Sequence, residues 1–268
     1  MRDRTKRQLA ALCAGALMLA GGSLAPAQTP SPAAQELLAA KVLETSVRAR
    51  GGTDTETAKM RRVYAELELK YPDDPAIKNA YAEFLWSLEE RAAAVRQWEA
   101  ALRLAPTNAV VLNHLGGAHL AAGDVRTAYD CFTRATEAEP SAALYHFNLA
   151  NVAFLFRHEL PPSEARAFEV ATEHFAAASR LEPGSADYLR AYAELFYSLP
   201  KPDWRTALAA WQRFHELTPH KDFALANLAR VHMKLGQKVE ARACLAQIHG
   251  PAFDRLKARL NDRIDTEP

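Results

Sequence analysis

The sequence is poor in the features that usually mark enzymes, metal sites or disulfide-stabilised proteins. Its 268 residues include only three cysteines and 11 glycines. No Gly-rich phosphate loop, G-x-S-x-G motif or Cys-x-x-Cys pair occurs. Positive and negative side chains nearly balance, with a formal net charge of +1, which argues against a nucleic-acid partner. These absences favour a binding protein that uses no cofactor and no metal.

Two short histidine motifs imitate metal sites without the required spacing. The stretch HELTPH, from His215 to His220, resembles a zinc-protease motif, but its histidines are five positions apart and Pro219 ends the helix. Two histidines share a helical face when they are four positions apart. The stretch HELPP, from His158, has no second histidine at ligand spacing. We therefore expect a protein that is not an enzyme.

Long apolar runs are also scarce, and the clearest lies at the N-terminus. The basic start MRDRTKR is followed by an uncharged run from Leu9 to Gly22 and then by APA at residues 25–27. This order is typical of a secretory signal peptide, and the run is shorter than the about 20 residues that span a membrane. We predict a signal peptide at residues 1–27 and an exported protein, periplasmic or extracellular, with no stable span after cleavage. An uncleaved run that anchors the protein is the alternative.

Three series of residues recur along the rest of the chain. A proline series and a series of small residues both advance by 34, 34, 43 and 36 residues. A third series pairs an alanine with a large residue four positions later. The members are Pro72, Pro106, Pro140, Pro183 and Pro219; Ala82, Gly116, Ala150, Ala193 and Ala229; and Ala94, Ala128, Ala171, Ala207 and Ala241, followed by Trp98, Phe132, Phe175, Trp211 and Leu245.

This pattern resembles the tetratricopeptide repeat, in which a period of 34, a small residue, A-x3-F and a closing proline recur. The resemblance covers residues 75 to about 248 and is clearest from Ala109 to Ala142. It implies pairs of antiparallel helices, an inner helix A and an outer helix B, that stack into an all-α, right-handed α-solenoid. Gly116 would then lie where helix A approaches helix B, and Gly117 would face the concave side.

The expected organisation follows the repeat register. A tether and the start of the first helix occupy residues 28–40, a degenerate repeat occupies 41–74, and a C-terminal capping helix and tail occupy 249–268. In the degenerate repeat, GGTDTET supplies the turn and helix cap. The five clear repeats of residues 75–248 are bounded at 75–108, 109–142, 143–185, 186–221 and 222–248.

Extra residues interrupt the pattern at two places. Nine are inserted around FRHELPPSE and two around SLPKPDW, in both cases between helix A and helix B. Two interpretations stay open, a binding edge made by the two loops or drift in loops that tolerate length at little cost. The edge-loop candidates are His158, Glu159, Pro161, Pro162, Pro200, Lys201 and Trp204.

The two cysteines beyond the signal peptide occupy equivalent places. Cys131 and Cys244 take the same position of helix B, three repeats apart. Stacked helices lie about 8–10 Å apart, whereas the Cα atoms of a disulfide lie within about 7 Å of each other. We therefore expect two free thiols that pack as small apolar groups.

The resemblance further implies that the inner helices line a concave groove. Its candidate residues mix aromatic rings, which supply buried area, with amides and charges that suit a peptide backbone. Phe154 and Met233 are expected instead to pack between neighbouring inner helices. The groove candidates are Asn79, Glu83, Trp86, Asn113, Gly117, Leu120, Phe147, Asn151, Arg190, Tyr197 and Arg230.

The expected function is therefore that of a non-catalytic scaffold or adaptor of the cell envelope. It would bind a partner protein or peptide through the groove, through the inserted edge, or through both. The alternative is a helical-repeat module that binds carbohydrate or an envelope polymer, because Trp86, Tyr197 and Trp204 have rings that stack on sugars.

Overall fold

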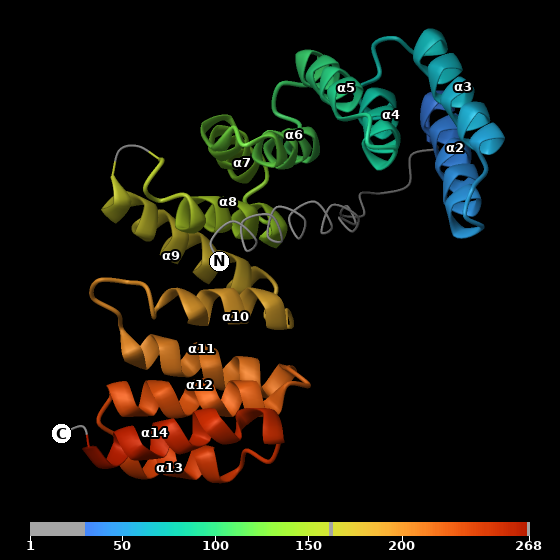
Figure 1. The fold of residues 1–268 in the computed structure, drawn as a ribbon. Helices are drawn as coiled ribbons and strands as arrows, with labels where there is room; N and C mark the ends of the chain where they lie inside the picture. The colour runs from blue at the N-terminus through green and yellow to red at the C-terminus, as the bar shows by residue number, and fades with distance from the viewer. Residues whose placement is uncertain (1–29, 161–162, 267–268) are drawn as a thin grey trace. The chain divides into compact units, whose positions relative to one another are not determined.

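The computed structural model describes residues 30–160 and 163–266, which form helices, turns and bends (Figure 1). The predicted signal peptide at residues 1–27 lies outside the described residues, and so do Pro161 and Pro162. The predicted all-α class is confirmed. The chain divides into two compact units, residues 1–139 and residues 140–268.

The N-terminal unit consists of three antiparallel helix pairs, each joined by a short turn. Its core is formed by clusters of alanine, leucine and aromatic side chains, in which Tyr64 and Trp98 are completely buried. Its helices are α2 (Pro32–Ala49) and α3 (Asp54–Lys70), α4 (Pro75–Ser87) and α5 (Arg91–Leu104), and α6 (Ala109–Ala122) and α7 (Val125–Ala138).

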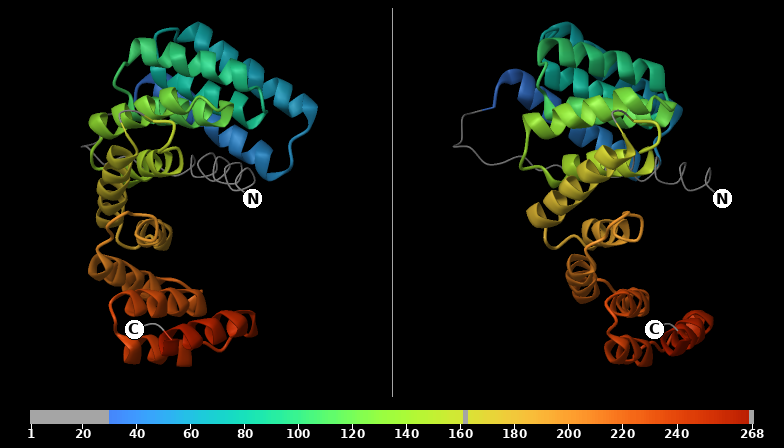
Figure 2. Two further views of the ribbon diagram at one scale, coloured as in Figure 1. Left: turned by 60° about the vertical axis from the view of Figure 1, so that its left-hand side comes forward. Right: turned by 90° about the vertical axis from the view of Figure 1, so that its left-hand side faces the viewer.

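The C-terminal unit also contains three helix pairs, and a further helix packs against the last pair (Figures 1 and 2). Leu260 and Ile264 of that helix are buried against Leu225 and Leu245, so it caps the apolar end of the unit as predicted. The helices are α8 (Ala143–Leu155) and α9 (Glu164–Leu181), α10 (Ala186–Leu195) and α11 (Trp204–Leu217), α12 (Lys221–Lys234) and α13 (Lys238–Ala246), a short 3-10 turn η2 (Pro251–Phe253) and α14 (Asp254–Thr266).

Polar side chains fix where the helices begin, because the first N–H groups of a helix have no partner inside it. Thr53 and Glu56 form a reciprocal capping box at the start of α3, which confirms the predicted turn and cap in GGTDTET. The first described helix begins early within residues 28–40, the range predicted to hold the tether and the start of the first helix. Ser31 accepts a hydrogen bond from the N–H of Ala34, and α2 therefore begins already at Pro32.

The three repeating series form the packing framework of both units. Each series proline lies two residues beyond the end of an outer helix, where it prevents the helix from continuing. All small and large members of the other two series are buried, including Tyr64, which lies one period before Trp98. The framework predicted from spacing alone is thus the one that the structure uses.

Gly116 shows why a small residue is needed in the second series. A Cβ atom at this position would lie only 2.7 Å from Cε1 of Phe132 and 2.8 Å from its Cδ1. Real Cβ atoms do not approach a ring so closely, so the ring would have to move. Gly116 therefore permits α6 to approach Phe132 of α7, which confirms its predicted close-packing role and offsets the low helix propensity of glycine.

Candidate functional site

In the N-terminal unit, the predicted groove residues Asn79 and Glu83 satisfy each other and their neighbours. Asn79 Nδ2 donates to Glu83 Oε1 at 2.8 Å, and Trp98 Nε1 donates to Asn79 Oδ1 at 3.0 Å. Nδ1 of His114 lies 3.1 Å from the same Asn79 oxygen, and Lys41 Nζ lies 3.4 Å from Glu83 Oε2. The polar groups of this inner face are therefore engaged within the unit.

His114 completes this network as a neutral ring. Burial lowers the pKa of His114 to about 4, so the imidazole is uncharged near neutral pH. The indole N–H of Trp98 can only donate, which makes Oδ1 the group of Asn79 that accepts from it. A neutral His114 that bonds to this same oxygen carries its proton on Nδ1.

The remaining groove candidates of this unit also offer little surface. The guanidinium of Arg91 stacks over the ring of Trp86 at 3.8 Å from the centroid, and the Trp86 and Trp98 rings are 5.4 Å apart. Asn113, Gly117 and Leu120 are buried. Gly117, which the repeat register places on the concave side, therefore offers no exposed surface to a ligand in this structure.

The groove candidates of the C-terminal unit separate into packing residues and cavity residues. Phe147 is half-buried, with its ring 4.6 Å from that of Tyr188, and Asn151 is buried. Arg190, Tyr197 and Arg230, by contrast, line cavities of this unit. Arg190 belongs to the inner helix α10, Tyr197 to the turn directly after α10, and Arg230 to the inner helix α12.

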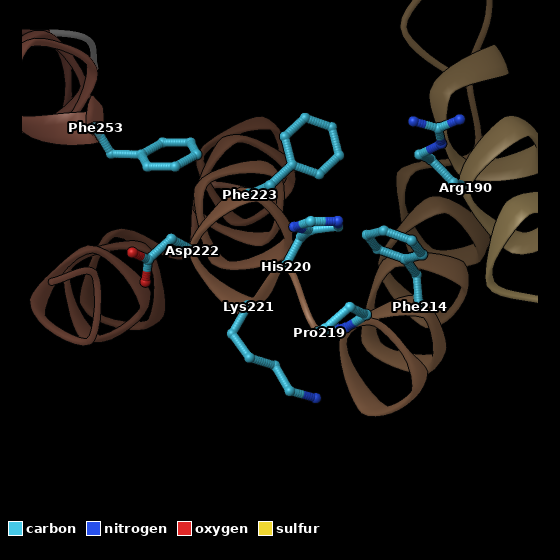
Figure 3. Close-up of a pocket in the computed structure, with 8 residues that line it drawn as sticks. All are labelled: Arg190, Phe214, Pro219, His220, Lys221, Asp222, Phe223 and Phe253. Carbon is cyan, nitrogen blue, oxygen red and sulfur yellow. The ribbon is translucent and has the colours of Figure 1, made fainter. Parts of the chain in front are cut away.

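The first cavity has a volume of about 600 Å³ and aromatic walls (Figure 3). Phe214 and Phe223 lie edge to face. In the view of Figure 3, the His220 ring appears between these two side chains, and Phe253 appears on the other side of Phe223. Arg190 of α10 approaches from the side of Phe214 and Phe223. The cavity therefore combines apolar walls with a cation at one side.

The carboxylate that lines this cavity is already engaged. Asp222 accepts hydrogen bonds from the backbone N–H groups of Gly250 at 2.7 Å and His249 at 3.5 Å. Lys221 donates to the carbonyl groups of His215 and Glu216, at the C-terminal end of α11. Lys221 and Asp222 therefore hold the turns around the cavity rather than project into it.

The second cavity, of about 300 Å³, lies where the inner helices end. Tyr197 donates from its hydroxyl to the backbone carbonyl of Asn227 at 3.2 Å, and the Arg230 guanidinium stacks over the Tyr197 ring at 4.3 Å. The Trp204 ring lies 5.6 Å from that of Tyr197. The remaining lining residues are Met233, Lys234, Leu260 and Arg263.

Two groove candidates and one edge-loop candidate thus meet at the second cavity. Tyr197 and Arg230 are groove candidates, and Trp204 begins α11 directly after the inserted residues. Pro200 and Lys201 of the same loop are exposed. The groove and the loop edge were predicted as two separate surfaces. Here they share one cavity, because Trp204, which follows the loop, lies beside Tyr197 and Arg230 of the inner face.

The longer insertion, which connects α8 to α9, lines neither of the two cavities among its described residues. His158 and Glu159 are exposed, and His158 Nδ1 lies 3.5 Å from Glu164 at the start of α9. Leu160 of the same loop is buried. Arg157 Nε forms an ion pair with Glu164 Oε1 at 3.1 Å, so the described part of this loop is held by packing and by this ion pair.

Solved structures of repeat proteins share this architecture. YrrB, described as a TPR protein with an unusual peptide-binding site, matches 75% of this chain and 97% of its own at a TM-score of 0.61 and 16% identity. PilF of Pseudomonas aeruginosa matches 88% of this chain and 99% of its own at a TM-score of 0.60 and 18% identity. The chain has the tetratricopeptide-repeat (TPR) fold. MamA of Desulfovibrio magneticus RS-1 gives a TM-score of 0.52 at 17% identity, over 71% of this chain and 97% of its own.

The sequence itself is distant from characterised proteins. No protein-family model matches it, and no curated protein is significantly similar to it in sequence. The TPR assignment therefore rests on the fold and on the repeated packing residues.

Several residues that line the two cavities of this protein were not predicted from its sequence. Lys234 lies one turn beyond Arg230 on α12, so helical spacing alone offered a signal for it. Phe253 and Arg263 come from the segment after the last repeat, for which the repeat register gives no position. Met233, expected to pack between neighbouring inner helices, is partly buried and lines the second cavity. Phe154, for which the same was expected, lies with its ring 6.3 Å from that of Phe168 on the outer helix α9.

Residues 30–160 and 163–266, the part of the chain that the structure describes, contain free thiols but no cluster of metal ligands. In these ranges no three histidine, cysteine, aspartate or glutamate side chains gather as a group that could hold a metal ion. Cys131 and Cys244 are free thiols, and burial raises the pKa of each. No helix of the described ranges is long and apolar enough to cross a membrane.

Proposed function

We propose that the protein is a non-catalytic interaction scaffold or adaptor, which binds a segment of a partner protein on the inner face of its C-terminal unit. The observation that carries this proposal is the pair of cavities along α10 and α12, lined by aromatic side chains and cations. Partly open apolar cavities with a few polar groups are typical of binding sites. The peptide-binding site named for YrrB is consistent with such a use of the fold.

We further propose that the protein acts in the cell envelope, after export by residues 1–27. The support is the order of basic, apolar and small residues at the start of the sequence. Mass spectrometry of the protein from its native cells should find a first residue at Gln28. A chain that begins at Met1 and stays with the membrane would contradict cleavage and favour the anchored form.

Affinity capture followed by direct binding tests the scaffold function. The parent protein, a Phe223→Ala/Arg230→Gln variant and a control Arg213→Gln variant are used as baits for native envelope extract. A specific partner should be retained by the parent and the control and lost from the double variant, and the purified partner should bind with the same pattern. Arg213 is a suitable control because it is exposed on the outer helix α11, where it pairs with Glu216.

The alternative of a carbohydrate- or polymer-binding module is favoured by one observation. Tyr197 and Trp204 present rings 5.6 Å apart beside Arg230, an arrangement that suits an anionic sugar. A glycan array that shows binding by the parent and none by a Trp204→Ala variant would support this function. Trp86 is a weaker candidate for sugar stacking because Arg91 covers one face of its ring.

A further inference from the structure

The two cavities of the C-terminal unit lie at opposite ends of one face. On α12, Phe223 of the first cavity and Arg230 of the second are seven residues apart, which places them on the same side of the helix. Arg190 and Tyr197 have the same separation and belong to the same two cavities. The hydrogen bond from the Tyr197 hydroxyl to the carbonyl of Asn227 links the turn after α10 to α12 within this face.

This spacing sets the length of a ligand that contacts both cavities. Seven helical residues rise by about 10 Å, at about 1.5 Å each. An extended peptide covers about 3.3 Å per residue, so about three residues connect the cavities. A short peptide segment is therefore long enough to occupy both.

The cavities differ in chemistry. The first has three phenylalanine walls. The cation at its side, Arg190, lies 3.7 Å from the carboxylate of Asp187, and the carboxylate of Asp222 is held by backbone N–H groups. Among the described residues, the second is lined by the cations Arg230 and Lys234 and by no carboxylate. A large apolar side chain fits the first cavity, whereas a carboxylate complements the second.

We propose that the partner segment is an extended acidic peptide, with a large apolar side chain about three residues from an aspartate or glutamate. The apolar side chain enters the first cavity, where it contacts Phe214 and Phe223, and the carboxylate pairs with Lys234 and the neighbouring Arg230. This inference rests on the proposed function and adds the chemical class of the partner to it.

A random 12-residue peptide library displayed on phage, selected on the purified full-length protein, tests the proposal. The selected peptides should be enriched in Asp or Glu at two to four positions from Leu, Phe, Met or Trp. Selected peptides that bind without this acidic enrichment, or with no preferred spacing, would overturn the inference and leave the peptide-binding function standing. Failure to select any peptide, together with binding of an oligouronate, would overturn both.

Two matched variants locate the charge contact. A selected peptide, made synthetically, should bind a Lys234→Gln variant about fivefold more weakly than the parent, while Arg213→Gln leaves its affinity unchanged. Lys234 is exposed, so its substitution leaves the core packing intact. Selection on Lys234→Glu should shift the enriched residues away from Asp and Glu. Equal affinity for the two Gln variants, or an unchanged acidic preference with Lys234→Glu, would contradict the proposed contact.

Discussion

The two units place different side chains at equivalent repeat positions of their inner faces. In the N-terminal unit, Trp86 lies under the guanidinium of Arg91 from the next helix of the same pair. The equivalent residues of the C-terminal unit are Tyr197 and Trp204, and the cation over the Tyr197 ring is Arg230 from the following inner helix. Here the aromatic residues and the cation line a cavity.

The polar groups show the same contrast. Asn79, Glu83 and His114 bond to one another in the N-terminal unit, which leaves few donors or acceptors for a ligand. In the C-terminal unit, Lys234 and Arg230 border an opening whose described lining residues include no carboxylate. A regular stack of repeats can thus close its inner face, whereas changed residues and inserted loops can open it.

The cores of the two units should respond alike to a large cavity. Trp98 and Trp211 hold the same repeat position, and both are completely buried. Replacing either by alanine should lower the free energy of unfolding by about 3–5 kcal/mol, the usual range for a buried aromatic residue. Urea titrations of both variants, followed by circular dichroism, measure the losses. A loss below about 1 kcal/mol for one of them would show that its unit does not depend on the common framework.

Acidification should destabilise the network of the N-terminal unit through His114. The folded-state pKa of about 4 lies below the ordinary value of 6.5, so the unfolded chain binds the proton first. The free energy of unfolding should therefore be unaffected by this group above about pH 6.5 and fall between pH 6.5 and 4, by about 3 kcal/mol in total.

A His114→Asn variant isolates this effect. The difference in stability between pH 7.5 and pH 4.5 should be smaller in the variant than in the parent protein. A His119→Asn variant, which changes a partly exposed histidine of the same helix, should retain the full difference. An identical pH dependence in the parent and the His114 variant would show that His114 does not titrate in this way.

The close approach at Gly116 should tolerate no side chain. Gly116→Ala should cost about 1–3 kcal/mol, because the Phe132 ring must move, even though alanine favours helix by about 1 kcal/mol. Gly184→Ala is the control, since a Cβ atom there meets nothing within 4 Å. Thermal unfolding of both variants tests the prediction, and a stabilised Gly116→Ala protein would contradict it.

The smallest effect is expected at the exposed edge of the N-terminal network. Lys41→Gln removes an ion pair to Glu83 between two partly exposed side chains, 45% and 33% accessible. Such pairs contribute less than about 1 kcal/mol, so the melting temperature should change little. A loss as large as that from Gly116→Ala would mean that Lys41 holds the network in place.

The repeat spacing was sufficient to predict the packing but not the site. The contact between neighbouring helices recurs with the period of the sequence, and this contact determines which residue types occur at Trp98, Gly116 and Phe132. The pairing of Asn79 with Glu83 depends on side-chain rotamers, which periodicity does not specify. Phe253 and Arg263 come from the capping segment, whose position relative to α12 depends on tertiary packing of Leu260 and Ile264.

Hydrogen–deuterium exchange with a selected acidic peptide tests the central claim most directly. Added to the full-length protein, the peptide should slow exchange at the ends of α10 and α12, around residues 190–204 and 223–234. Exchange around residues 79–86 and 113–120 should stay unchanged. Protection confined to these last two segments would contradict the claim that the C-terminal unit carries the binding face.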